Sequence, residues 1–196
     1  DKDLIQIGSE DSGPTDYEEL VIGRYCHRFG YLRGAYQALA HIDLFVTLVG
    51  RVPNYGEQYV VLVAEPHNAS PGDYTEMNKR YFQPLADQLN QVAADLEATS
   101  VKGNPNYFKV LRVPLPIARI HVKGARKYLW RPMSYNNCLV EHRGTHRRVC
   151  LPSYGSPLKN KLDRGTIEEA YLKPYDQWVQ SLWRNELDFE VVPLRN

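Results

Sequence analysis

The same order of predicted elements occurs twice in this chain of 196 residues, and each copy ends in the tripeptide Val-Pro-Leu, at 113–115 and at 192–194. In each copy, two β-rich segments joined by turn residues precede an amphipathic helical pattern, which a third strand follows. Each helical pattern also contains a proline, Pro84 in the first copy and Pro174 in the second. Because these features agree independently, they predict an internal duplication of a ββαβ unit, in the α/β class.

The first copy is predicted to open with a hairpin, whose turn contains Pro53 and Gly56. A helical pattern then begins at Thr75, and Pro84 is expected to split or kink it. Its apolar stripe consists of Met77, Tyr81, Leu85, Leu89, Val92 and Leu96. The strands of this copy are expected at 44–49, 59–64 and 107–113.

The second copy repeats this order, with a hairpin turning around Arg143 and Gly144. Thr166 and Glu169 form a capping box that opens the next helix, and Pro174 interrupts that helix. Its apolar stripe is expected to consist of Ile167, Tyr171, Tyr175, Trp178 and Leu182. The strands are expected at 135–141, 147–151 and 189–192.

The duplication also predicts how the chain is divided. Residues 1–40 lack the repeated order and are expected to form a partial or atypical unit, whereas 41–196 form two units of one domain. Each unit exposes an apolar sheet face and open strand edges, so two units alone need neighbours. The expected neighbours are further units, or a second copy of the chain in a homo-oligomer.

Charge and composition exclude several classes of partner. The 24 Lys and Arg nearly balance the 23 Asp and Glu, and no basic run suits a phosphate backbone. No stretch approaches the ~20 apolar residues that cross a bilayer. We therefore expect neither nucleic acid nor membrane as a partner. Neither Gly-x-Gly-x-x-Gly nor a phosphate-binding loop occurs, and the histidines lack metal-ligand spacing, so no cofactor and no metal is expected.

The three cysteines, Cys26, Cys138 and Cys150, do not suit a disulfide framework, because one would be left over. If the second hairpin turns at Gly144, Cys138 and Cys150 face each other across it, as a cross-strand disulfide or as two packed thiols. Reduced thiols favour the cytoplasm, and secretion is the alternative, so the compartment is left open.

The pair His41 and Asp43 is the first candidate for chemistry. Alternation of Ile42, Leu44, Val46 and Leu48 predicts a strand with those residues on one face, which places His41 and Asp43 together on the other. A carboxylate matches a planar guanidinium, and an imidazole exchanges protons near neutral pH. The alternative is a structural hydrogen-bonded pair at the end of a strand.

Five segments in this order resemble one known family. The stretches HIDLFVTLV, VVLVAEP, VLRVPLP, SYNNCLV and RRVCLPSYG, with the long helix between the second and third, are similar to the agmatine deiminase and bacterial peptidylarginine deiminase family. The resemblance covers roughly residues 41–194. It implies a pentein-type propeller, built of ββαβ modules around a central active site, of which this chain holds two complete modules.

The resemblance also implies roles for individual residues. His41 matches the family's general acid and base, and Asp43 matches a carboxylate that grips the guanidinium. The segment EDSGP is similar to the family's Arg-Asp-x-Gly-Pro, apart from its first residue, which makes Asp11 a second guanidinium carboxylate. Asn137 matches the asparagine of a Tyr-x-Asn strand, and Arg112 matches an arginine before a proline pair, both in architectural or peripheral roles at the substrate site.

The implied activity converts the guanidino group of arginine, agmatine or peptidyl arginine to a ureido group and ammonia by covalent cysteine chemistry. In the family a nucleophilic cysteine follows the last strand, and this sequence reaches Asn196 without one, so the nucleophile is expected beyond it. The alternative is a non-catalytic pentein-fold protein that binds a cationic ligand or has a structural role. A third possibility is a generic α/β domain whose resemblance is coincidental.

Overall fold

The computed structural model describes residues 42–69, 82–101, 103–121, 128–155 and 169–195. Together they form a mixed α/β structure with two sheets and two helices. The four-stranded sheet has the order β1-β2-β3-β4, and the three-stranded sheet has the order β5-β6-β7. The strands are β1 Val46–Arg51, β2 Tyr59–Asn68, β3 Phe108–His121, β4 Tyr128–Pro132, β5 Leu139–Arg143, β6 His146–Ser153 and β7 Glu190–Arg195; the helices are α3 Gln83–Glu97 and α4 Glu169–Ser181.

The two sheets share one topology, which confirms the repeated order of elements. In the first, β1 and β2 are antiparallel, α3 follows, and β3 then pairs with β2 in parallel. In the second, β5 and β6 are antiparallel, α4 follows, and β7 pairs with β6 in parallel. We call residues 42–121 the first unit and 139–195 the second unit. The strand β4 extends the first sheet, and sequence patterns did not predict it.

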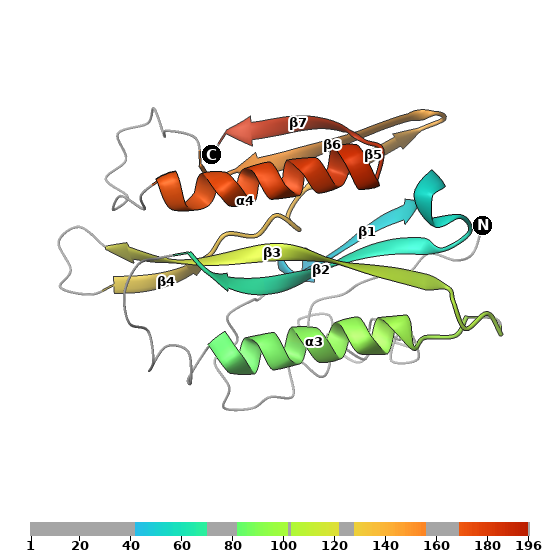
Figure 1. Cartoon of the computed structure of the whole chain (residues 1–196), viewed down its shortest axis with the longest axis horizontal. Coiled ribbons are helices and arrows are strands. Elements are labelled where there is room, and N and C mark those ends of the chain that lie inside the picture. Colours follow the sequence, from blue (N-terminus) through green and yellow to red (C-terminus); the bar gives the residue numbers. More distant parts are fainter. Residues whose placement is uncertain (1–41, 70–81, 102, 122–127, 156–168, 196) are drawn as a thin grey trace, which may run out of the picture.

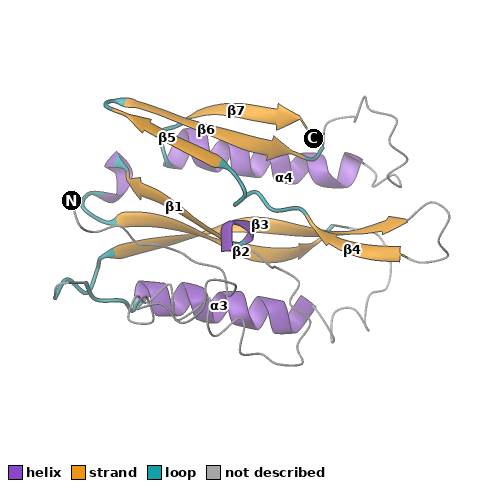
Figure 2. Cartoon of the chain, turned by 180° about the vertical axis from the view of Figure 1, so that it is seen from behind, coloured by secondary structure: helices purple, strands orange, loops and turns teal. Residues whose placement is uncertain are grey.

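The layers are arranged so that α4 lies between the two sheets, while α3 covers the outer face of the four-stranded sheet (Figures 1 and 2). One core cluster joins α3 to that outer face through Val61, Val63, Leu89 and Leu96. A second cluster joins the inner face of the first sheet to α4 and the smaller sheet, through Leu62, Val113, Val149, Leu151, Val179 and Trp183. Helix α4 of the second unit therefore covers one face of the four-stranded sheet of the first unit.

The strand β3 is longer than the sequence predicts, because it runs through Pro114 and Pro116 to His121. Proline cannot donate to a ladder and is tolerated where its nitrogen faces away from the neighbouring strand. Met133 donates its backbone N–H to the carbonyl of Pro116 at 2.8 Å, from the side opposite β2. The nitrogens of these two prolines point toward that same side, and the parallel ladder with β2 stays intact.

Pro174 does not interrupt its helix, which corrects the expectation, whereas the split or kink predicted at Pro84 stays a prediction, because residues 70–81 lie outside the described part of the chain. Pro84 is the second residue of α3, close to the start of a helix, where proline is well tolerated. The helix α4 continues through Pro174 to Ser181. Thr75, Met77, Tyr81, Thr166 and Ile167 lie outside the described residues.

The apolar stripe predicted for α3 is confirmed where it is described, since Leu85, Leu89, Val92 and Leu96 are buried. The stripe predicted for α4 is confirmed only in part, because Tyr175 packs against the second core cluster but two other members are exposed. Tyr171 and Trp178 are 38% and 44% exposed, and the buried face carries Leu172, Asp176 and Val179 instead. Trp183, in the π-helical turn Leu182–Glu186 that extends α4, is fully buried, and Leu182 is also buried as predicted.

The second hairpin turns at Gly144, which has a φ of 60°, as expected. The pairing of β5 with β6 places Cys150 opposite Leu139, which is 68% exposed. The side chains of Cys150 and Leu139 therefore lie on the same, outer face of the sheet. Cys138 packs against the second core cluster instead. Both thiols are free, and they do not face each other across the hairpin as the sequence suggested.

Candidate functional site

Asp43 does not lie on a strand, which corrects the predicted register. Residues Ile42–Leu44 form a 3-10 turn, hereafter the Asp43 turn, which Phe45 closes by donating its N–H to the carbonyl of Ile42 at 2.9 Å. Phe45, Val46 and Thr47 are buried in succession, so the alternation expected from Ile42 to Leu48 is absent. The Asp43 side chain is exposed. His41 and Asp11 lie outside the described residues, so their predicted positions near Asp43 stay predictions.

A loop between the two units packs directly on this turn. This junction loop, residues 133–138, connects β4 to β5. Ser134 donates its hydroxyl to the carbonyl of Leu44 at 2.6 Å, one residue after Asp43. Thr47 donates its hydroxyl to the carbonyl of Asn136 at 2.8 Å. The chain that leads into the second unit is thus hydrogen-bonded to Leu44 and Thr47, which follow Asp43.

The buried amide of the junction loop belongs to Asn136, not to Asn137. Asn136 is 2% exposed, and its Nδ2 donates to the hydroxyl of Thr47 at 3.2 Å and to the carbonyl of Leu62 at 3.1 Å. Its Oδ1 is buried and has no hydrogen-bond partner. Asn137, the residue chosen from the sequence, is exposed. The two asparagines lie in a bend of the loop and not on the strand predicted from residue 135, and sequence patterns do not show which side chain of a bend turns inward.

A buried carboxylate on α4 anchors the same loop from the second unit. Asp176 is 6% exposed. Its Oδ1 accepts from the Tyr135 hydroxyl at 2.6 Å and the Tyr154 N–H at 3.0 Å. Its Oδ2 accepts from the Ser153 hydroxyl and the Gly155 N–H, both at 2.8 Å. Four donors therefore compensate the burial of this charge.

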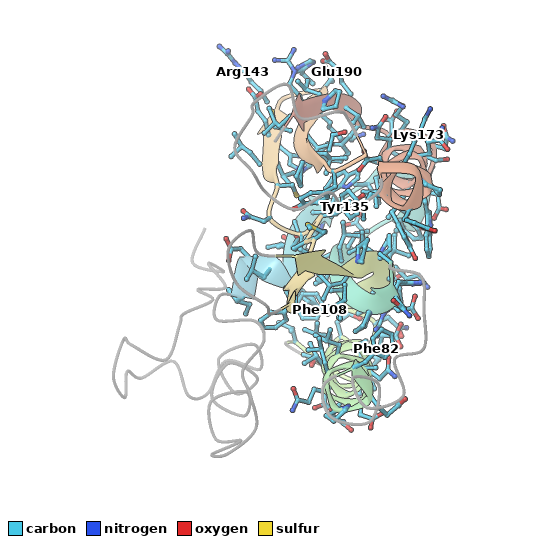
Figure 3. The ribbon with its side chains drawn as sticks, turned by 90° about the vertical axis from the view of Figure 1, so that its left-hand side faces the viewer. Phe82, Phe108, Tyr135, Arg143, Lys173 and Glu190 are labelled. Carbon is cyan, nitrogen blue, oxygen red and sulfur yellow. The ribbon has the colours of Figure 1, made fainter. Side chains whose placement is uncertain are left out.

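Tyr135 sits between the two sheets, at the centre of the molecule (Figure 3). Burial raises the pKa of its phenol, and the hydrogen bond to the Asp176 carboxylate raises that pKa further. The ring also contacts Tyr154 edge-on, with 5.2 Å between centroids. Tyr135 therefore stays a neutral hydrogen-bond donor, and it ties the junction loop to Asp176 on α4.

Arg112 has a structural position in the first unit, and its predicted place in the substrate site stays a prediction. Its guanidinium donates to the carbonyl of Leu89 on α3 at 3.3 Å and to that of Ala64 on β2 at 2.9 Å. Burial lowers the pKa of Arg112, while the carboxylates of Glu65 and Glu97 oppose that effect. Arg112 thus ties α3 to the sheet.

Cys138 is poorly suited to act as a nucleophile, because a thiolate is the reactive form. Burial raises the pKa of its thiol to about 12, although a hydrogen bond with Thr47 acts in the opposite direction. The thiol stays protonated at neutral pH. Cys26 lies outside the described residues.

We predict that the protein loses stability in base. The folded state holds the Cys138 proton more tightly than the unfolded chain, whose thiol has a pKa near the ordinary 9.0. Between pH 9 and 12 the folded state therefore binds more protons, and its free energy of unfolding falls as pH rises, by about 2–4 kcal/mol. Urea unfolding at several pH values measures this slope. Cys138→Ala should make the slope shallower, most clearly between pH 9 and 10, since above pH 10 the raised pKa of Tyr135 also lowers stability. Cys150→Ala should not change the slope; an equal slope in all three proteins contradicts the assignment.

Wider properties of the chain add little to this site. Within the described ranges, no group of three or more His, Cys, Asp and Glu side chains could hold a metal ion. Among the described helices, none is long and apolar enough to cross a membrane. No protein-family model matches the chain, and no curated protein matches it either.

Proposed function

We propose that this chain is part of a guanidino-group deiminase built as a pentein-type propeller. Asp43 binds the guanidinium of the substrate, His41 transfers protons, and a cysteine other than the three in this sequence is the nucleophile. Asp11 is the second carboxylate. Asn137 and Arg112 belong to the periphery of the substrate site. The substrate is free arginine, agmatine or a peptidyl arginine, and no cofactor takes part.

The observation that carries this proposal is the contact between the Asp43 turn and the junction between two ββαβ units. In a propeller of such units, the site lies at the centre, where successive units meet. The Ser134 hydroxyl reaches the carbonyl of Leu44, beside Asp43, from the chain that links the units. An exposed carboxylate beside such a junction is available to a ligand that enters there.

The exposed face of the smaller sheet also supports a larger assembly. Leu139 on β5 and Leu194 on β7 are 68% and 48% exposed, on a sheet that α4 covers only from the other side (Figure 1). The corresponding arrangement in the first unit has both faces of its sheet covered, by α3 and by α4. Further units, or a second copy of the chain, would cover the outer face.

The proposed chemistry follows from the residue types. A carboxylate forms paired hydrogen bonds with a planar guanidinium and holds its carbon for attack. The thiolate adds to that carbon, a C–N bond breaks, and the leaving nitrogen takes a proton from His41 to depart as ammonia. Water, deprotonated by His41, then adds to the same carbon and the C–S bond breaks. The product is a ureido group, and the cysteine is restored.

Binding of agmatine to the protein tests the proposal. We expect agmatine at 100 times its Kd to stabilise the fold by about 2.7 kcal/mol, seen as a higher Tm. Asp43→Asn should weaken binding at least tenfold, because it removes the charge that pairs with the guanidinium. Asp87→Asn, on the exposed side of α3, is the matched control and should bind normally. If agmatine, arginine and an arginyl peptide all leave Tm unchanged, the proposal fails.

The second candidate is a non-catalytic pentein that binds a cationic ligand, for which the exposed carboxylate of Asp43 suffices without a nucleophile. Turnover separates the two. Formation of a ureido product by the intact protein, lost in His41→Ala, supports the deiminase. Binding of a guanidinium compound without any ureido product supports the binding protein.

A further inference from the structure

Three consecutive residues of the junction loop form hydrogen bonds alternately to the first unit, the second unit and the first unit again. Ser134 and Asn136 bind the first unit, through Leu44, Thr47 and Leu62. Tyr135, between them, binds Asp176 on the helix of the second unit. All three are at most 3% exposed, so water does not compete for their hydrogen bonds. The loop therefore links the Asp43 turn to α4 through hydrogen bonds in immediate succession.

We propose that Tyr135, held by Asp176, is a positioning residue for the Asp43 turn. This inference rests on the proposed function insofar as the turn binds a guanidinium. Tyr135 is buried and therefore acts through its neighbours. Its hydroxyl holds the loop against Asp176. The adjacent Ser134 and Asn136 in turn hold the carbonyl of Leu44, next to Asp43, and the hydroxyl of Thr47. The second unit thus sets the position of a binding residue carried by the first.

The hydrogen bonds of Asp176 separate this role from simple stabilisation of the fold. Its four donors divide into Tyr135 in the junction loop, and Ser153, Tyr154 and Gly155 at the end of β6. Loss of the Tyr135 hydroxyl removes a direct hydrogen bond between the loop and Asp176. The Ser153 hydroxyl acts on the loop only indirectly, through the neighbouring Tyr154, whose hydroxyl donates to the carbonyl of Ser134 at 2.8 Å. Tyr135→Phe and Ser153→Ala are therefore matched variants, since each removes one hydroxyl from the same carboxylate.

Hydrogen exchange at the Phe45 amide reports on the turn without any ligand. That amide donates to the carbonyl of Ile42 and closes the Asp43 turn. We expect Tyr135→Phe to accelerate its exchange roughly threefold to tenfold, the effect of one lost hydrogen bond, relative to amides in the β2–β3 ladder. Ser153→Ala should leave that ratio within about twofold of the wild type. Equal ratios in the two variants would overturn the inference.

Agmatine affinity is the second readout, under conditions in which both variants are fully folded. We expect Tyr135→Phe to weaken binding roughly threefold to tenfold, and Ser153→Ala to bind as the wild type does. If the wild type itself does not bind agmatine, the proposed function fails, and the exchange ratios still decide whether Tyr135 positions the turn. If agmatine binds the wild type and both variants equally, Tyr135 has no positioning role and the proposed function stands.

Discussion

Replacing Asp176 by alanine is expected to lower the free energy of unfolding by about 4 kcal/mol or more, the largest effect of any single polar substitution in the described residues. The change removes an acceptor that satisfies two hydroxyls and two backbone N–H groups. Each buried donor left without a partner costs about 1–3 kcal/mol. Because domains of this size are stable by only about 5–15 kcal/mol, the variant should unfold in mild urea.

Two comparisons test this reading of Asp176. Asp176→Asn keeps the shape and one acceptor oxygen, but its NH2 group must face two donors, so its loss should be large and somewhat smaller than that of alanine. Asp87→Ala removes an exposed carboxylate of α3 that accepts only from Gln83, and should change stability by less than about 0.5 kcal/mol. Equal urea midpoints for the two alanine variants would show that the buried network contributes nothing.

The repeated unit could be predicted because hairpins and amphipathic helices leave periodic patterns in the sequence. The turn at Gly144 and the α3 residues Leu85, Leu89 and Val92 follow those patterns closely. The length of β3 could not be predicted, because Pro114 and Pro116 read as the end of a strand. Only the pairing partners on either side decide whether a proline nitrogen is tolerated there.

The candidate site was predictable in part. Its Asp43 segment was singled out, but its form was wrong, since alternating apolar residues predicted a strand where the chain forms a 3-10 turn. The buried polar residues Asn136 and Asp176 were missed. Nothing in a sequence distinguishes a buried asparagine or aspartate side chain from an exposed one until its hydrogen-bond donors and acceptors are known, and here these lie between 21 and 89 residues away.

The partly wrong face predicted for α4 has the same cause. Two stripes run along this helix one residue apart, the aromatic stripe 171, 175, 178, 182 and the stripe 172, 176, 179, 183. Hydrophobicity favours the first, because the second contains Asp176. Once four hydrogen bonds compensate that carboxylate, the second stripe can turn inward with Leu172, Val179 and Trp183. Tyr171 and Trp178 are then left partly exposed.

Two tryptophans on these neighbouring stripes provide the test. Trp183 is completely buried in the second core cluster and packs edge-on against Phe189, with 5.0 Å between ring centroids. Trp183→Ala should therefore cost about 3–5 kcal/mol, through lost burial and the cavity left behind. Trp178 is 44% exposed and touches His67 edge-on. Trp178→Ala should cost no more than about 1 kcal/mol, and urea midpoints in the reverse order would place the aromatic stripe in the core after all.

A third variant separates packing from hydrogen bonding at Trp183. Its indole Nε1 is buried without a hydrogen-bond partner, so the folded state already carries the cost of that unpaired N–H. Trp183→Phe removes the unpaired donor together with part of the ring. We therefore expect it to cost less than half as much as alanine, because removing the N–H offsets part of the lost contact area. A cost as large as that of Trp183→Ala would mean that the indole N–H does bind a partner, such as an ordered water, in solution.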